Sequence, residues 1–209
     1  MRTETAFVGA RVVDSYPFST SGTKEQAVAL KTRGVEGLAG YLGVIDTSRL
    51  RNVIEAGLAF MPLTLAGEYF NGPKATIARA FTLNLPKGCT IWMDLEGNRS
   101  FLANAKDLSS KINEFARALI LEGYIPGLYV GSPQPLTGDE LASLAVTRYW
   151  CAPSLIIDRA GRTWSEPTHI GFCMRQVWPQ GNYPGTDVFV DVNMVGQDRK
   201  GRLPTWVVA

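Results

Sequence analysis

The chain has 209 residues, 45% of them hydrophobic and 19% charged, a length and balance typical of one soluble globular domain with a sizeable core. Its formal net charge of +2 comes from scattered basic residues, which excludes a dedicated nucleic-acid binder because such proteins gather Lys and Arg on one face. No apolar stretch approaches the roughly 18 residues of a membrane span, and the N-terminus lacks the apolar region of a signal peptide. We therefore expect synthesis in the cytoplasm without membrane insertion.

Residues that could bind a metal or a cofactor are few. The three cysteines, Cys89, Cys151 and Cys173, lie far apart in apolar segments, so we expect buried free thiols in a reducing compartment. The single histidine, His169, lies in a segment expected to be a loop, with no nucleophile motif nearby. No HExxH, GxGxxG or P-loop order is present. The sequence therefore predicts no metal and no cofactor, and it predicts an exposed His169.

Strand and helix signals alternate along the first three quarters of the chain. Apolar and β-branched runs predict strands over residues 7–14, 35–42, 58–66, 89–96, 124–131 and 148–152. Amphipathic spacing, often closed by Gly, predicts helices over residues 23–33, 47–56, 73–85, 104–122 and 137–145. The Ser-, Pro- and Gly-rich segment 15–22 is expected to be a loop.

The last quarter of the chain has little helical signal. We expect strands over 172–178 and 188–192, a loop over 180–186, and an edge segment within the tail 199–209. Eight strands in β–α alternation predict parallel pairing with right-handed crossovers. Closing them gives an α/β fold, a shortened TIM-like (β/α) barrel with helices mainly after the first five strands. Nothing marks a second domain, so residues 1–209 are expected to form a single barrel.

The stretch CTIWMDLEG, residues 89–97, carries two acids at the end of a predicted buried strand. Asp94 and Glu96 are two residues apart, so their side chains point to the same face, roughly 6–7 Å apart. Such a pair is costly to desolvate because each charge raises the pKa of its neighbour, and it often serves chemistry. The alternative is structural, with one acid capping the next helix and the other in an ion pair.

Other acids fall at the same level of the predicted barrel, where the reactive groups of such folds lie. Asp14 ends the first strand and Asp191 falls near the end of the eighth, which neighbours the first on closure. Acids ringed by aromatic rings are typical of a sugar-cleaving groove, although core packing is the alternative for any one ring. The aromatic and amide residues at this level are Tyr41, Tyr129, Trp150, Gln176, Trp178 and Asn193.

These motifs, taken in order, resemble the glycoside hydrolase family 25 muramidases and their relatives, the domain-of-unknown-function 1906 glycoside hydrolase-like proteins. The matching segments are VVDSY, GYLG, AGLAFMPLTLAGE, the D-x-E motif within WMDLEG, GLYVGS, and RQVWPQG followed by VDVN. The opening VVDSYPF departs from the Asp-x-Ser form of the muramidases. The helix-containing connection over 72–85 is closer to the 1906 relatives.

The resemblance implies a peptidoglycan hydrolase that cleaves the β-1,4 bond between N-acetylmuramic acid and N-acetylglucosamine. It implies that Glu96 is the general acid and that Asp94 stays ionised to stabilise the oxocarbenium-like charge or to orient the N-acetyl group. Asp14 and Asp191 would hold the sugar and tune this pair. The expected substrate contacts are Tyr41, Glu68, Tyr129, Trp150, Gln176, Trp178 and Asn193. The choice between retaining, inverting and N-acetyl-assisted chemistry depends on carboxyl separations.

Two functions remain open at this point. The first is an active muramidase whose partner is peptidoglycan or a related amino-sugar polymer. It would be a phage-type endolysin or an exported effector, acting at the cell wall after release or export. The second is an inactive barrel that binds glycan or forms part of a larger particle, keeping the acidic groove as a relic.

Overall fold

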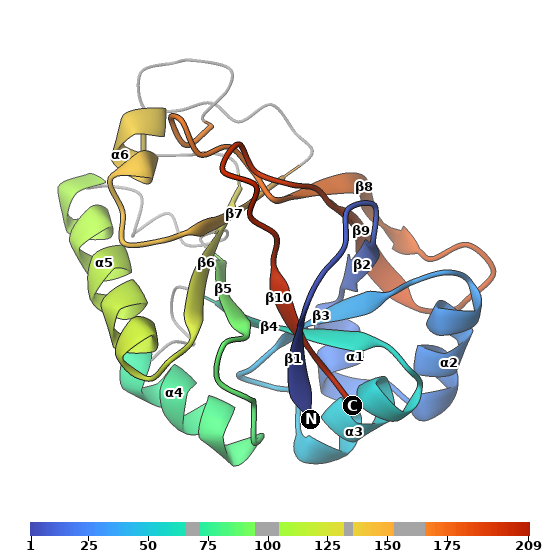
Figure 1. The fold of residues 1–209 in the computed structure, drawn as a ribbon. Coiled ribbons are helices and arrows are strands. Elements are labelled where there is room, and N and C mark those ends of the chain that lie inside the picture. The colour runs from blue at the N-terminus through green and yellow to red at the C-terminus, as the bar shows by residue number, and fades with distance from the viewer. Residues whose placement is uncertain (66–71, 95–104, 132–135, 153–165) are drawn as a thin grey trace.

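A closed eight-stranded barrel forms the centre of the computed structural model, which describes residues 1–65, 72–94, 105–131, 136–152 and 166–209 (Figure 1). The barrel closes because the last strand pairs with the first. Its strands are, in order, β2 (Arg11–Asp14), β3 (Gly37–Tyr41), β4 (Ala59–Leu65), β5 (Thr90–Asp94), β6 (Ile125–Val130), β7 (Arg148–Cys151), β8 (Met174–Asn182) and β9 (Phe189–Val195). The predicted shortened TIM-like barrel is thereby confirmed.

Strand direction is the main difference from the prediction. Strands β2 to β8 run parallel, whereas β9 runs antiparallel to both β8 and β2. The N–H of Tyr183 donates to the carbonyl of Val188 at 2.8 Å and closes a hairpin between β8 and β9. A parallel crossover needs a dozen or more residues, and the segment between these strands is too short for one.

Helices surround the barrel, with α4 and α5 side by side on one flank and α2 and α3 packed together on the other (Figure 1). The helix expected from residue 137 starts with a capping box, in which Thr137 and Glu140 each accept a hydrogen bond from the other's backbone N–H. The helices are α1 (Tyr16–Ser21), α2 (Lys24–Thr32), α3 (Thr47–Glu55), α4 (Pro73–Thr82), α5 (Ala105–Leu121) and α6 (Gly138–Ala142). None of the helices in the described ranges is both long and apolar enough to cross a membrane.

Helix α1 replaces the loop expected over residues 15–22. Ser15 caps it, since its Oγ accepts a hydrogen bond from the N–H of Phe18. Pro17 lies in the first turn, where the backbone N–H has no helical partner to lose. The Ser and Pro that suggested a loop therefore start a short helix.

Alternation along the strands divides the apolar side chains into two layers. Val13 and Ile91 face the helices, whereas their neighbours Val12 and Trp92 fill the barrel interior. Trp92 fits because its partner on β6 is Gly127, where an added Cβ would lie 2.5 Å from the indole ring. The interior is therefore a packed core.

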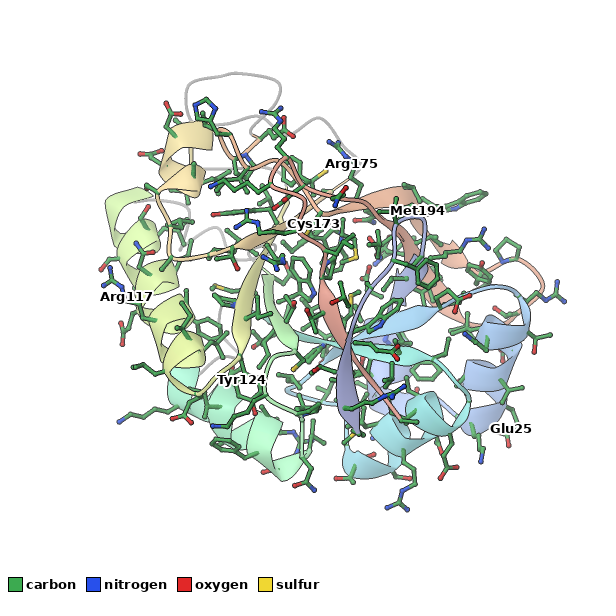
Figure 2. The ribbon with its side chains drawn as sticks, in the orientation of Figure 1. Glu25, Arg117, Tyr124, Cys173, Arg175 and Met194 are labelled. Atoms are coloured by element: carbon green, nitrogen blue, oxygen red, sulfur yellow. The ribbon has the colours of Figure 1, made fainter. Side chains whose placement is uncertain are left out.

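The view with side chains shows the same division (Figure 2). Glu25 on α2 and Arg117 on α5 extend away from the barrel, whereas Cys173 lies among the interior side chains. All three cysteines are buried free thiols, as expected, and burial raises the pKa of Cys151 to about 11 and those of Cys89 and Cys173 to about 12. Such thiols stay protonated and unreactive.

Two terminal strands cover the amino-terminal end of the barrel. β1 (Arg2–Thr5) pairs with β10 (Thr205–Val208), and β10 pairs with the start of β4. Trp206 of β10 packs on Gly37, where an added Cβ would lie 3.3 Å from its ring. The tail forms a strand as expected, but β10 lies between β1 and β4 and is therefore not an edge segment. The strand expected over 7–14 begins only at Arg11, and β1 was not predicted.

Candidate active site

Three of the predicted acids lie at the carboxyl-terminal end of the barrel. Asp14 ends β2 and Asp94 ends β5, each two residues beyond an interior side chain, so both carboxyl groups face inward. Their exposed fractions are only 9% and 6%. Asp191 is the register partner of Asp14 on β9 and is half-buried.

The position of Asp191 was predicted correctly but for the wrong reason. It was expected near the end of a parallel eighth strand, whereas it lies near the start of the antiparallel β9. The start of an antiparallel strand lies beside the ends of its neighbours, so Asp191 still reaches this end of the barrel. Glu96 and Glu68, the other two predicted acids, fall outside the described residues.

Asp14 belongs to a buried hydrogen-bonded cluster with Asn193 and Trp150. The Nδ2 of Asn193 donates to Oδ2 of Asp14 at 2.8 Å, and Nε1 of Trp150 donates to Oδ1 of Asn193 at 2.9 Å. The indole N–H thus fixes which way the amide points. The amide in turn donates to the carboxyl group of Asp14 and holds it in place.

Asp191 belongs to a second cluster of the same design, with Gln176 and Tyr129. The hydroxyl of Tyr129 donates to Oε1 of Gln176 at 2.8 Å, and Nε2 of Gln176 donates to Oδ1 of Asp191 at 2.7 Å. Burial raises the pKa of the Asp191 carboxyl, and hydrogen bonds from Gln176 and Gln180 act in the opposite direction. Tyr129 is also the register partner of Asp94.

The expected substrate contacts therefore divide into two groups. The amides of Gln176 and Asn193 have both ends engaged with protein groups, and the rings of Tyr129 and Trp150 are buried, 4.6 Å apart between centroids. These four side chains hold the carboxyl groups of Asp14 and Asp191 in place through two chains of hydrogen bonds. Direct contact between any of them and a sugar stays a prediction.

Tyr41 and Trp178 are different, because both keep ring surface accessible. Trp178 on β8 is 59% exposed, and Tyr41 at the end of β3 is half-exposed with its ring edge-on to Tyr16 at 5.4 Å.

His169 is exposed in a loop, as predicted, and has a positive φ of 61°. Within the described ranges no three His, Cys, Asp or Glu side chains gather closely enough to hold a metal ion.

A pocket of about 190 Å³ lies beside the acids, between the ends of β3 and β4 and the helices α1 and α4. The sequence did not predict it, because its walls come from four separate elements. Its main lining side chains are Tyr16, Tyr41, Thr64, Leu65, Thr76 and Arg79.

Trp92 lies below Asp94 and was not among the predicted site residues. Its position two residues before Asp94 signalled an interior ring, and its buried Nε1 has no hydrogen-bond partner among the described residues.

No protein-family model matches the chain, and no curated protein matches it in sequence. Solved structures do match. A lysozyme of Streptomyces coelicolor has a TM-score of 0.58 and 14% identity, over 91% of this chain and 93% of that one. The fold is similar to that of this bacterial lysozyme.

Two further structures extend this similarity. The spore cortex lytic enzyme SleM of Clostridium perfringens has a TM-score of 0.58 and 12% identity, over 96% of this chain and 71% of that one. A Tat-secreted protein of Mycobacterium tuberculosis, solved in complex with L-tartrate, has a TM-score of 0.61 and 14% identity, over 94% of this chain and 99% of that one. At these identities the similarity establishes a lysozyme-like barrel and leaves the activity to be argued from the site.

Proposed function

We propose that this protein is a peptidoglycan hydrolase of the N-acetylmuramidase type, which cleaves the β-1,4 bond between N-acetylmuramic acid and N-acetylglucosamine. The observation that carries the proposal is the group of inward-facing carboxyl groups of Asp14, Asp94 and Asp191 at one end of the barrel. Glycoside hydrolysis uses carboxyl groups flanking the scissile bond. The shared fold with a lysozyme and a cortex lytic enzyme supports the same substrate class.

In the proposed reaction Glu96 gives its proton to the leaving glycosidic oxygen as the bond from that oxygen to C1 breaks. Asp94 stays ionised and stabilises the positive charge that develops on the sugar ring. Asp14 and Asp191 hold the sugar and keep the acidic pair in its working protonation states. The accessible rings of Tyr41 and Trp178 would stack on sugar faces. Water finally supplies the hydroxyl group that C1 receives, and its remaining proton restores the acid form of Glu96.

The proposed place of action is the cell wall. The mycobacterial neighbour is a Tat-secreted protein, which supports export for a barrel of this kind. Release by a phage-type membrane hole is the other route to the same substrate. Either route brings the acidic end of the barrel to peptidoglycan.

The test is a turbidity assay on purified peptidoglycan. We expect the wild-type protein to clear the suspension, and we expect Glu96→Gln and Asp94→Asn to slow clearing by about a hundredfold or more. Glu25→Gln serves as the matched control, because Glu25 is an exposed acid on α2 that extends away from the barrel (Figure 2).

Two outcomes would contradict parts of this proposal. A wild-type protein that binds wall material and clears nothing would identify an inactive glycan-binding barrel. If Glu96→Gln clears as fast as the Glu25→Gln control, Glu96 is not the general acid, even though the hydrolase class survives.

A further inference from the structure

The pocket beside the acids contains a fixed positive charge. Arg79 extends from α4, where its Nε donates to the carbonyl of Leu42 at 3.0 Å and its Nη2 donates to the carbonyl of Ile45. These two bonds hold the guanidinium plane against the turn after β3. The remaining nitrogen, Nη1, makes no hydrogen bond to any described residue and is left for a ligand.

No carboxylate of the described chain balances this charge. Among the described residues that line the pocket Arg79 is the only charged one, and it forms no ion pair within the described ranges. Asp46, which follows Ile45, is engaged by Arg49 at 2.5 Å. A half-buried guanidinium that pairs with no described carboxylate favours an anionic ligand, because its planar donors suit the oxygens of a carboxylate.

The rest of the pocket suits a small substituent. The buried hydroxyl groups of Thr64 and Thr76 lie 3.4 Å apart, and the rings of Tyr16 and Tyr41 form the apolar wall. The volume of about 190 Å³ is below the roughly 300 Å³ at which pockets begin to hold drug-sized ligands. One carboxylate with its neighbouring carbons would fill such a space, whereas a glycan chain would not.

The pocket also opens next to the acids. Tyr41 lies two residues beyond Ala39, which is the register partner of Asp14 on the neighbouring strand. The Tyr41 ring packs against the interior cluster below the acids and lines the pocket on its other side. A ligand that occupies the acidic end would therefore carry its side groups past Tyr41 toward Arg79.

We propose that the Arg79 pocket binds a carboxylate carried by the amino-sugar polymer, close to the bond that is cleaved. This inference rests on the proposed function and names the part of the substrate that the pocket recognises. Two sources share this chemistry, namely the lactyl carboxylate of a muramic residue without peptide and a carboxylate of the attached peptide.

The experiment places a competing charge inside the pocket. Ala75 lies on α4 one turn before Arg79 and lines the same pocket with an exposed side chain. In Ala75→Glu the new carboxylate is placed to pair with Arg79 across the i, i+4 spacing, while the bonds of Arg79 to the Leu42 and Ile45 carbonyls remain. Ala75→Gln has nearly the same size without the charge, so the ratio between the two variants isolates the charge.

Binding is measured by calorimetry in the Asp94→Asn background, in which turnover is expected to be about a hundredfold slower or more. The probes are N-acetylmuramic acid, a muramoyl peptide and neutral tri-N-acetylglucosamine. We expect Ala75→Glu to bind a carboxylate probe about tenfold more weakly than Ala75→Gln, with equal binding of the neutral probe. The probe that binds Ala75→Glu tenfold more weakly than Ala75→Gln shows whether the pocket recognises the lactyl carboxylate or a peptide carboxylate. Thermal unfolding of both variants checks that each is folded.

Equal binding of both carboxylate probes by the two variants would overturn the inference, as would an equal loss for the neutral probe. Failure of the pocket and failure of the hydrolase are distinguishable. A tenfold ratio in a protein that clears no peptidoglycan keeps the pocket and rejects the enzyme. Clearing by wild type without a tenfold ratio between the two variants keeps the enzyme and rejects the pocket.

Discussion

The Asp14 cluster (Asp14, Asn193 and Trp150) and the Asp191 cluster (Asp191, Gln176 and Tyr129) have the same design in different surroundings. In each, an aromatic donor fixes an amide, and the amide donates to a carboxylate at 2.7 to 2.8 Å. The Asp14 cluster is buried throughout, with Asn193 fully inaccessible, whereas Asp191 and Gln176 are only half-buried.

This difference decides what each carboxylate can do. Inside the Asp14 cluster no water can replace a lost hydrogen bond, so the carboxylate is held in one place. Asp191 contacts solvent and can exchange a proton, and burial already raises the pKa of its carboxyl. Surroundings that differ in this way allow one site to hold one carboxyl group in place while a second one titrates.

The largest expected effect comes from removing the buried amide. Asn193→Leu removes the hydrogen bond that the amide donates to Asp14 and the acceptor of the buried Trp150 N–H, so we expect the free energy of unfolding to fall by about 2–4 kcal/mol. Gln176→Leu, its counterpart in the Asp191 cluster, is expected to cost less than about 1 kcal/mol because water can replace the amide. Urea unfolding of both variants measures the difference. Equal losses would show that solvent access does not separate the clusters.

A smaller effect is expected from removing only the aromatic donors. Trp150→Phe leaves a buried acceptor on Asn193 unsatisfied, which should lower the free energy of unfolding by about 1–3 kcal/mol, including the smaller ring. Tyr129→Phe removes one hydroxyl beside the half-exposed Gln176 and should cost about 0.5–1.5 kcal/mol. Thermal unfolding compares the two. A larger loss for Tyr129→Phe would reverse the proposed order of the clusters.

Much of the acidic end could be predicted from the sequence because it depends on local periodicity. Apolar runs located the strands, and the two-residue spacing from Val12 to Asp14 and from Trp92 to Asp94 put the acids on the interior face. Strand direction is a different matter. Alternation does not distinguish a parallel from an antiparallel β9, and only the short hairpin that includes Tyr183 does.

The amide clusters and the Arg79 pocket had no local signal. The bond between Asn193 and Asp14 joins residues 179 positions apart, and it exists only because the barrel closes. The bonds from Arg79 to the carbonyls of Leu42 and Ile45 span 37 and 34 positions and involve backbone atoms that every residue carries. Because every residue has a backbone carbonyl, no sequence motif indicates which carbonyl groups Arg79 contacts.

The smallest expected effect distinguishes the clusters by pH. Because the pKa of Asp191 is raised on folding, the folded protein binds this proton more tightly than the unfolded chain does. The resulting stabilisation is present below the unfolded pKa of about 4 and is lost as the pH rises through the folded pKa. Asp191→Asn cannot titrate, so its free energy of unfolding should rise relative to wild type between about pH 4 and neutral pH, by less than about 1 kcal/mol because the group is half-exposed.

Unfolding curves of wild type and Asp191→Asn at acidic and neutral pH measure this difference. Asp14→Asn is the matched comparison, because it replaces the carboxylate oxygen that accepts from the Nδ2 of Asn193 by a neutral amide, which is a weaker acceptor. That variant should lose stability at neutral pH, opposite in sign to Asp191→Asn. If both variants shift in the same direction at neutral pH, the two carboxyl groups are equivalent, and the division between a carboxyl group held in place at Asp14 and a titrating group at Asp191 is wrong.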